Sequence, residues 1–496
     1  MSLSEVEFFF FFPAFLLLYW GLSFAARGSA RATLQNSVLV AGSLFFYATW
    51  SLKLLGLFVA TSLFDYAVLR GFAANPPPAD DTPADAAARA SRRRRVLLAL
   101  GLTQNLIALA GFKYLGFFTD SLNHALGTNL FVLRVALPLG ISFYTMGRIG
   151  VLIDTYYDRI PPVRSLLVWF AFVSFFPQLI AGPIGRGSEL FHQYESPRKL
   201  DPEVLLKAVR ELAVGFVLKV YVAAQIGSEW VDPVFAEPGT FTRKAHVFAM
   251  VGYGAQVFGD FAGYSLIAIG VGRCLGIALP DNFNFPFLST NPPEVWRRWH
   301  MSLNRWLFDY IYGPMVTGES FMRGRIGLGF IVVMLASGLW HGAAWTYVLW
   351  GGLHGLWLLA HYRYDLFYKS LCRKDRAWVQ RRKSTPYKLV GWAVTIGFFV
   401  VTLVPFRAPS LAACGHFFQG LARGGSESLE ASTGHPLVAL FLVFAYHAYQ
   451  LPMFTRLREA LPTVPAAIRG VVLGVVVILL MMFAPVGAGT FIYAQF

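Results

Sequence analysis

Charged side chains are scarce in this sequence of 496 residues: only 14% are Asp, Glu, Lys or Arg, against about 25% in soluble domains. Hydrophobic residues make up 56% of the chain, and 46 residues are phenylalanine. This balance excludes an ordinary soluble protein. Several apolar runs reach the roughly 20 residues that a helix needs to cross a bilayer, and they do not alternate as barrel strands do. Because unpaired backbone cannot face hydrocarbon, the sequence predicts an all-α polytopic membrane protein.

The signatures of several enzyme and transporter classes are missing. The chain has no Walker A or GxGxxG phosphate loop, which argues against an ATP-driven pump. It has no GxSxG elbow of a serine hydrolase and no HExxH motif, so we predict no metal site. The three cysteines, Cys274, Cys372 and Cys414, lack CxxC spacing and therefore indicate neither a disulfide framework nor a zinc site.

Positive charge is in excess, with a formal net charge of +15. The basic residues gather in short loops between apolar runs, as the positive-inside rule predicts for cytoplasmic loops. They are Arg27 and Arg31, Arg92 to Arg95, Arg159 with Arg164, and the region 363–388. The simpler interpretation is topology and contact with anionic membrane lipids; binding of a phosphate-rich cytosolic donor is the sharper one, and the two are compatible. We predict no nucleic-acid partner.

The apolar runs predict roughly 11–13 spans within one membrane domain covering residues 1–496. The expected spans are 8–25, 35–50, 54–70, 96–117, 131–153, 165–182, 212–232, 246–275, 326–340, 342–360, 389–405, 436–452 and 470–491. The run 165–182 ends in Ala-Gly-Pro and is expected to be re-entrant. Residues 72–95, rich in Pro, Ala and Asp before an arginine cluster, are expected to form a flexible cytoplasmic loop.

The segment 276–325 does not fit a simple span. Its stretch 296–312 is too charged for lipid and too aromatic for an exposed helix. Irregular or polar backbone at membrane depth is tolerated only where protein or a water-filled cavity surrounds it. We therefore expect short tilted helices that line a central tunnel, inside a catalytic core of about residues 136–360.

Two histidines in this core are the leading candidates for chemistry. His300 lies in WRRWHMSLNRW (296–306), and His341 lies in GLWHGAAW (338–345) between apolar runs. Ionisable groups at membrane depth are costly and usually functional, and an imidazole can take or give a proton near neutrality. The alternative is a structural hydrogen bond to a neighbouring helix. His354 is expected on the same helix as His341 or just beyond it. On a shared helix it would lie about 140° around from His341, outside the site.

The arginines around His300 have two interpretations. On a continuous helix Arg297 falls beside His300 at i+3 spacing, where a cation disfavours a charged imidazole. Arg297, Arg298 and Arg305 are also suited to gripping the phosphates of a nucleotide donor. Alternatively they mark the cytosolic interface, with the nearby tryptophans as belt residues. Asp309 is a candidate partner for an arginine or an imidazole.

These residues, together with several ordered motifs, closely resemble the membrane-bound O-acyltransferase (MBOAT) family, and within it the branch of alginate O-acetyltransferase and D-alanyl-lipoteichoic acid transferase. The motifs are the Phe-rich span 8–19, LPLGISFYT (137–145), FPQLIAGPI (176–184), NFNFP (282–286), the stretch 296–312 and LWHG (339–342). Two segments depart from the branch pattern. Leu266 replaces an acidic residue in the GYSL segment, and the MGR segment ending at Arg148 differs from the usual continuation.

The resemblance implies a helical bundle around a central tunnel, with His341 as the essential histidine and His300 as a second functional position. Donor or substrate binding is then expected from Arg297, Arg298, Trp299, Asn304, Arg305, Asp309, Trp340 and Trp345. It also implies that an acetyl group from a cytosolic donor, acetyl-CoA, crosses the bacterial inner membrane to an extracytoplasmic partner that acetylates an exported polysaccharide such as alginate. No bound cofactor is expected.

Alternatives remain open at this point. One is O-acylation of another cell-envelope glycan. A second is a transporter or flippase of a lipid-linked or anionic solute, although inverted repeats typical of such proteins are not visible in the sequence. A third is an accessory scaffold without chemistry of its own.

Overall fold

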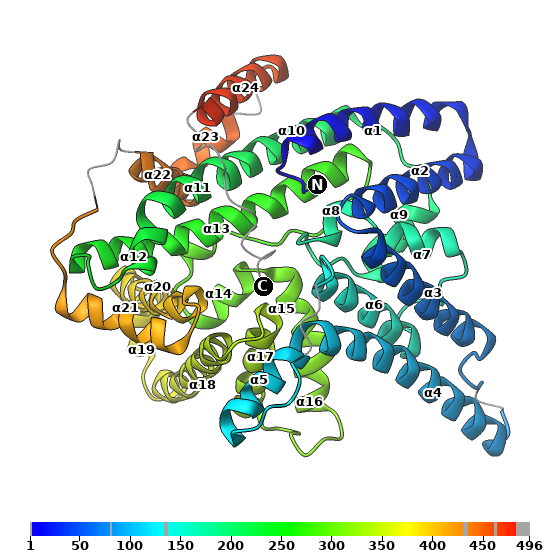
Figure 1. Ribbon diagram of the computed structural model, residues 1–496, viewed down its shortest axis with the longest axis horizontal. Coiled ribbons are helices and arrows are strands. Elements are labelled where there is room, and N and C mark those ends of the chain that lie inside the picture. Colours follow the sequence, from blue (N-terminus) through cyan, green and yellow to red (C-terminus); the bar gives the residue numbers. More distant parts are fainter. Residues whose placement is uncertain (1, 80–81, 133–136, 430–434, 461–463, 483–496) are drawn as a thin grey trace. The chain divides into compact units, whose positions relative to one another are not determined.

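The computed structural model describes residues 2–79, 82–132, 137–429, 435–460 and 464–482, and in these ranges the regular secondary structure is helical (Figure 1). Contacts gather the chain into two compact units: unit 1 holds Met1–Leu212 and Ile267–Pro280, and unit 2 holds Ala213–Leu266 and Asp281–Phe496. Helices α10 and α13 carry residues of both units. The all-α fold is as predicted, whereas a single membrane domain over 1–496 stays a prediction.

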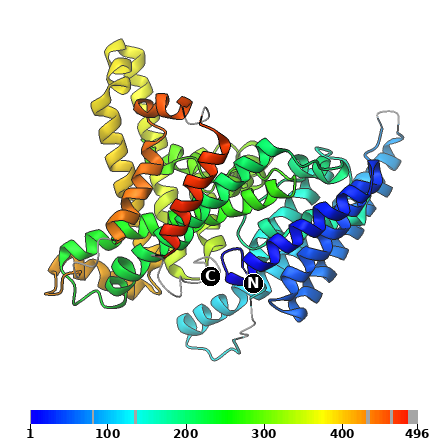
Figure 2. The same ribbon diagram turned by 90° about the horizontal axis from the view of Figure 1, so that it is seen from above.

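Unit 1 begins with four long helices that lie side by side (Figure 2). The elements of this part of the chain are α1 (Val6–Ala25), α2 (Gly28–Ala48), α3 (Leu52–Ala74), α4 (Ala84–Leu109), η1 (Ala110–Tyr114), α5 (Leu115–Leu126), α6 (Ile141–Tyr156), α7 (Leu166–Val173), α8 (Phe176–Leu179), α9 (Gly187–Glu195) and α10 (Pro202–Phe216). The Phe-rich start of the chain is used for packing: Phe15 lies 5.8 Å from the ring of Phe176, and Phe46 lies 5.2 Å from it.

Two boundaries in unit 1 differ from the sequence-based expectation. Helix α4 starts at Ala84 and contains the arginine cluster, so the expected loop 72–95 reduces to the connection between Ala74 and Ala84; five alanines in 84–90 favour helix over loop. The run 131–153 becomes helical only at Ile141, after Pro138 and a left-handed Gly140. Residues 133–136, and 483–491 of the last expected span, lie outside the described residues.

The run 165–182 is not one helix. It forms the two short helices α7 and α8, separated by Ser174 and Phe175, in keeping with the expected re-entrant segment. A glycine allows the close approach of α8: a Cβ on Gly140, which has φ +70°, would lie 2.1 Å from the carbonyl oxygen of Leu179. The sequence signal was Ala181, Gly182 and Pro183 at the end of the apolar run.

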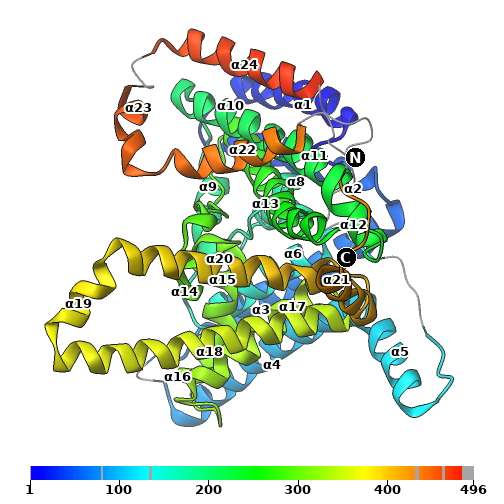
Figure 3. The ribbon, with the colours of Figure 1, turned by 90° about the vertical axis from the view of Figure 1, so that its left-hand side faces the viewer.

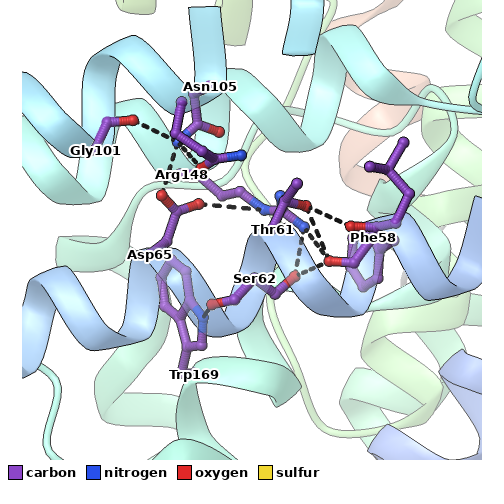
Figure 4. A network of polar contacts seen from close by, with 10 residues as sticks. Phe58, Thr61, Ser62, Asp65, Gly101, Asn105, Arg148 and Trp169 are labelled. Atoms are coloured by element: carbon purple, nitrogen blue, oxygen red, sulfur yellow. Dashed lines mark hydrogen bonds and ion pairs between the residues drawn. The ribbon is translucent and has the colours of Figure 1, made fainter. Parts of the chain in front are cut away.

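A buried ionic network links α3, α4 and α6 within unit 1 (Figure 4). Arg148 and Asp65 are both fully buried, with Nε and Oδ2 3.9 Å apart. The guanidinium donates to Thr61 Oγ1 at 2.8 Å and Ser62 Oγ at 2.5 Å, and Asn105 Nδ2 donates to Asp65 Oδ1 at 2.8 Å. Charges in such surroundings need partners, and α3 supplies those of Arg148.

Unit 2 contains the remaining elements. They are η2 (Val217–Ala223), α11 (Ala224–Ile226), η3 (Gly227–Val231), α12 (Asp232–Ala236), α13 (Arg243–Cys274), η4 (Pro286–Leu288), α14 (Pro292–Arg298), α15 (Met301–Leu307), η5 (Phe308–Tyr312), α16 (Gly313–Thr317), α17 (Ile326–His341), α18 (Trp345–Lys374), α19 (Arg376–Lys383), α20 (Thr385–Arg407), α21 (Leu411–Arg423), α22 (His435–Ala448), η6 (Pro452–Phe454), α23 (Thr455–Ala460) and α24 (Ala466–Met482). Helices α18 and α20 form a long hairpin closed by α19 (Figure 3).

Helices α17 and α18 pack closely against each other, because glycines at the contact leave room for backbone. A Cβ on Gly351 would lie 2.4 Å from the carbonyl oxygen of Met334. The chain turns between them, so His341 ends α17 while His354 lies on α18. Of the two expected placements, the structure has the second: His354 lies beyond the helix of His341, because Gly342 and Ala344 adopt extended backbone.

Among the described residues, four helical stretches are long and apolar enough to cross a membrane: Val6–Ala25, Leu52–Ala74, Ala84–Leu126 and Thr385–Arg407. Helices α17 and α22 are apolar but shorter. The expected number of roughly 11–13 spans thus stays a prediction. Short helices are confirmed in the segment 286–317, where the sequence was too polar and too aromatic for a simple span.

Candidate functional site

A broken helix places His300 in the interior of unit 2. Helix α14 begins at the N-cap Asn291, whose Oδ1 accepts from the backbone N–H of Glu294 at 3.0 Å. It ends at Arg298, and α15 starts at Met301. Between them His300 has φ 44° and ψ 52° and is completely buried. A left-handed non-glycine residue stores roughly 1–3 kcal/mol of strain, which persists only where the surroundings enforce it.

The surroundings of His300 are a second loop, and backbone hydrogen bonds tie the two together. Asn282 accepts at its carbonyl oxygen from Met301 N at 2.9 Å, and Asn284 N donates to the carbonyl oxygen of Arg298 at 2.8 Å. This second loop contains Phe285, which also has a left-handed φ of 48°. Two segments with unusual backbone therefore fix each other.

The side chain of Asn282 orients the ring of His300. Its Oδ1 lies 3.1 Å from His300 Nδ1 and accepts from the backbone N–H of Ser302 at 3.2 Å and from Ser302 Oγ at 2.8 Å. Its Nδ2 donates to Ser265 Oγ at 3.0 Å. A backbone N–H can only donate, so the amide atom facing Ser302 must be oxygen. His300 Nδ1 must then carry a proton, which leaves Nε2 as the acceptor of the neutral imidazole.

The Nε2 atom of His300 is buried and has no hydrogen-bond partner among the residues that the structure describes. Around it lie the rings of Phe261 and Trp340, with centroids 4.5 and 5.5 Å from that of His300. A buried polar atom without a partner is uncommon, and it calls for an explanation such as a catalytic or ligand-binding role.

His341 lies close to His300. It is the last residue of α17 and is 3% exposed, and the two ring centroids are 6.4 Å apart. Since ring nitrogens lie about 1.2 Å from a centroid, the closest possible N–N distance is about 4 Å, too long for a direct hydrogen bond. Trp340 packs beside both rings, at 4.9 Å from His341.

The aromatic wall behind His341 comes from two further helices. Trp350 of α18 and Phe406 of α20 lie 5.2 and 5.1 Å from its ring. Phe406 lies outside the expected catalytic core of about 136–360, whose bounds stay a prediction. Sequence reasoning missed both residues, since nothing in the local pattern of an apolar span indicates which aromatic residue faces inward.

The flanking glycines of His341 serve close packing. A Cβ on Gly342 would lie 2.1 Å from the ring of Tyr347, and one on Gly338 would lie 2.2 Å from its carbonyl oxygen. The sharp turn after His341 thus depends on both glycines. Gly338 admits the backbone of Tyr347, and Gly342 admits its ring.

The arginines near His300 differ in their surroundings. Arg298 is held by Glu294, with Nη2 and Oε1 2.9 Å apart, and donates to the carbonyl oxygen of Asn284 at 3.1 Å. Although partial burial raises the pKa of Glu294, hydrogen bonds from Thr290 and Arg298 lower it below its usual value. Arg298 therefore fastens the loop that precedes His300.

Arg297 and Arg305 are exposed, whereas His300 is buried. The helical i+3 neighbourhood expected for Arg297 and His300 does not exist, because α14 ends at Arg298. A role for the exposed arginines in holding donor phosphates stays a prediction.

The other candidate residues occupy varied positions. Asn304 donates from Nδ2 to the carbonyl oxygens of Trp296 and Trp299 at 2.7 and 2.6 Å, which closes the gap between α14 and α15. The ring of Trp299 packs in an aromatic cluster with Phe399 at 5.1 Å. Trp345 is 53% exposed, and Asp309 is half-buried in η5. Their expected part in donor binding remains a prediction.

His354 was expected to lie outside the site and borders its aromatic wall. It is fully buried on α18, with its ring 4.7 Å from Trp350 and Nε2 2.9 Å from Thr402 Oγ1. This contact with a helix neighbour fits a structural histidine. It differs from His300, whose ring is fixed by a loop.

Several apolar helices and a broken helix in the interior of unit 2 define a helical membrane protein, in which two buried histidines lie close together. Residues 155–401 match the family model described as MBOAT, membrane-bound O-acyltransferase family. The chain belongs to the membrane-bound O-acyltransferase family, and it is an O-acyltransferase.

Curated relatives support the same assignment. The chain is 33% identical to the probable alginate O-acetylase AlgI of Pseudomonas aeruginosa, over 92% of this chain and 81% of that protein. It is 31% identical to the peptidoglycan O-acetyltransferase of Helicobacter pylori, over 82% and 79%. It is also 31% identical to the teichoic acid D-alanyltransferase of Streptococcus thermophilus, over 53% and 65%. The predicted resemblance and enzyme class are confirmed.

Proposed function

We propose that this enzyme takes an acetyl group from cytosolic acetyl-CoA and passes it across the membrane for O-acetylation of an exported polysaccharide such as alginate. The observation that carries the chemistry is the buried pair of His300 and His341, whose ring centroids are 6.4 Å apart beside Trp340. The acceptor class comes from relatives named alginate O-acetylase.

His341 is proposed as the general base. The acceptor hydroxyl attacks the thioester carbonyl, a C–O bond forms and the C–S bond breaks. His341 takes the hydroxyl proton and returns it to the departing thiolate, so that acetyl ester and free thiol are the products. In a variant of this scheme, the imidazole of His341 first accepts the acetyl group from the thioester and then passes it to the acceptor hydroxyl. The aromatic wall around His341 would keep water from the thioester.

His300 is proposed to position the acceptor. Because Asn282 Oδ1 accepts a hydrogen bond from His300 Nδ1–H, the neutral ring offers only the lone pair of Nε2. A lone pair accepts a hydrogen bond from a hydroxyl and repels a carbonyl oxygen. In this form His300 therefore selects the alcohol, and the thioester carbonyl must be polarised by another group.

The exposed arginines Arg297 and Arg305 are proposed to meet the phosphates of the donor on the cytosolic side, with Trp345 and Asp309 at the same entrance. An extracytoplasmic transferase or other polysaccharide-modifying protein would receive the acetyl group, in the inner membrane of a bacterium. This arrangement rests on the positive-inside distribution of the basic residues.

The test is transfer of radiolabelled acetyl from acetyl-CoA in proteoliposomes. Wild type is compared with His341→Gln and His341→Ala, and His246→Gln serves as the matched control because His246 is also buried but packs against Phe417. We expect both His341 variants to lose at least 100-fold of the transfer rate, as is typical for a general base, with the control near wild type. Equal rates in wild type and His341→Gln would refute the proposed base.

A second acceptor class has its own support. One relative is named a peptidoglycan O-acetyltransferase and another a teichoic acid D-alanyltransferase. Supplying alginate, peptidoglycan fragments and teichoic acid in the external volume of the same proteoliposomes, with the partner protein present, distinguishes the classes. Label on peptidoglycan alone would replace alginate in the proposal and leave the role of His341 unchanged.

A further inference from the structure

A basic cavity lies between the end of α3 and the first turns of α4, within unit 1 and outside the histidine site. Its volume is about 450 Å³, and it is lined by Asn75, Arg89, Arg92, Arg93, Val96 and Leu97. The five α4 residues follow i, i+3, i+4, i+7 and i+8 spacing, so they share one face of the helix. The three arginines thus lie on the same face of α4 as Val96 and Leu97, and N-terminal to them.

The three arginines of this cavity do not hold the described part of the fold together. Arg89, Arg92 and Arg93 are exposed, and they make no hydrogen bond or ion pair with any described residue. Their neighbour Arg94 is different. It is buried and donates to the carbonyl oxygen of Tyr156 at 2.7 Å and to Asp158 Oδ1 at 2.7 Å. Arg94 therefore anchors α4, which leaves the cavity arginines available for a ligand.

The cavity stands where α4 changes from polar to apolar. Below the arginines, Val96, Leu100 and Ile107 are 51%, 49% and 66% exposed. At 100° per residue these side chains fall within about 40° of one another on the helix, directly below Arg89 and Arg93. Val96 to Ile107 spans about 16 Å, close to half of the roughly 30 Å hydrocarbon core.

We propose that this cavity is a binding site for an anionic phospholipid: the arginines bind the headgroup phosphate and the apolar stripe below them carries an acyl chain. Guanidinium groups match phosphate oxygens by paired hydrogen bonds, and basic pockets at membrane helices bind anionic headgroups. A soluble phosphate ligand would use the arginines alone. The exposed apolar stripe of Val96, Leu100 and Ile107 is about as long as one leaflet is deep, and it therefore favours a lipid over a soluble phosphate.

The experiment is native mass spectrometry of the full chain released from detergent after equilibration with phosphatidylglycerol, phosphatidylcholine or coenzyme A. The site variant is Arg89→Gln/Arg92→Gln/Arg93→Gln. The matched control is Arg373→Gln/Lys374→Gln/Arg376→Gln, which removes the same charge from exposed residues away from any such cavity. The melting temperature of each protein establishes that it is folded.

We expect wild type and control to retain phosphatidylglycerol at least tenfold better than the site variant, and all three proteins to retain phosphatidylcholine equally weakly. Retention of phosphatidylglycerol by the site variant at the wild-type level would overturn the proposal. So would an equal loss in both triple variants, which would mean charge attraction without a site. Binding of coenzyme A that depends on the three arginines, with lipid retention unchanged, would assign the cavity to a soluble phosphate instead. If the triple variant does not fold, Arg92→Gln and Arg93→Gln are measured singly, with a threefold loss or more expected of each.

Discussion

The hydrogen bonds around Asn282 make its substitution the most informative perturbation of the site. Asn282→Ala removes the acceptor of His300 Nδ1 and of the Ser302 backbone N–H, at 3.1 and 3.2 Å, and the donor to Ser265. All four residues are buried. Hydroxyl groups can turn to other partners, but the amide of Ser302 and the ring N–H of His300 cannot do so without movement.

The expected cost follows from these two donors. A buried donor left without a partner costs about 1–3 kcal/mol, so the free energy of unfolding should fall by roughly 2–6 kcal/mol. In the folded fraction, His300 would lose both its fixed tautomer and its ring orientation. Misplacement of a positioning group by about 1 Å can cost on the order of 100-fold in rate, and we therefore expect kcat to fall about 10- to 100-fold.

The assay is acetyl transfer in proteoliposomes, with rates expressed per folded protein. Asn284→Ala is the matched control, because Asn284 lies in the same motif, is exposed and uses only its backbone in the contacts of the loop. The KM for acetyl-CoA should change less than about threefold, since a positioning residue for the acceptor does not hold the donor. A folded Asn282→Ala enzyme with wild-type kcat would refute the assignment of His300 as an oriented acceptor.

Three further predictions concern stability. Asp65→Leu leaves the Arg148 cation buried and should destabilise by about 3–5 kcal/mol, whereas the Asp65→Leu/Arg148→Leu double variant should recover most of the loss; melting temperatures that add independently would contradict this coupling. Gly342→Ala should lower both melting temperature and activity because its Cβ would lie 2.1 Å from a tyrosine ring, whereas Gly397→Ala, with open space around it, should do neither. The pKa of Glu294 is lowered in the fold, so its contribution to stability is present above its usual pKa and is lost as pH falls. The melting difference between wild type and Glu294→Gln should therefore shrink in acid, and a difference that grows there would exclude this linkage.

The sequence was a good guide to the fold where apolar runs were long, and a poor one where polar residues joined a helix. It predicted an all-helical membrane chain because 56% hydrophobic composition allows little else. It failed at Arg92 to Arg95, which was assigned to a loop. The sequence of four arginines does not show that one of them is buried in the fold while the other three are exposed. Arg94 donates to carbonyl and carboxylate oxygens of residues about 60 positions away. Contacts so distant in sequence cannot be predicted from the local pattern.

For the site, composition identified the two histidines but not how they are held. His300 and His341 stood out as ionisable residues in apolar or aromatic surroundings, and the structure brings their rings to 6.4 Å. The short helices expected here are present, but a continuous helix through Arg297 and His300 is not, because tertiary hydrogen bonds override helix propensity at His300. Asn282 was visible only as part of a family motif, and its role depends on contacts with residues 18 and 20 positions later.

The two histidines are positioned by different physical means, and this difference supports different roles. His341 ends a long helix, and the glycine-dependent turn that follows it lets Trp350 and Phe406 enclose its ring. His300 instead occupies a strained left-handed backbone and donates Nδ1–H to a side chain that accepts two further hydrogen bonds. That network opposes any change of tautomer. A base must exchange its proton in each turnover, so the geometry favours His341 for proton transfer and His300 for orientation.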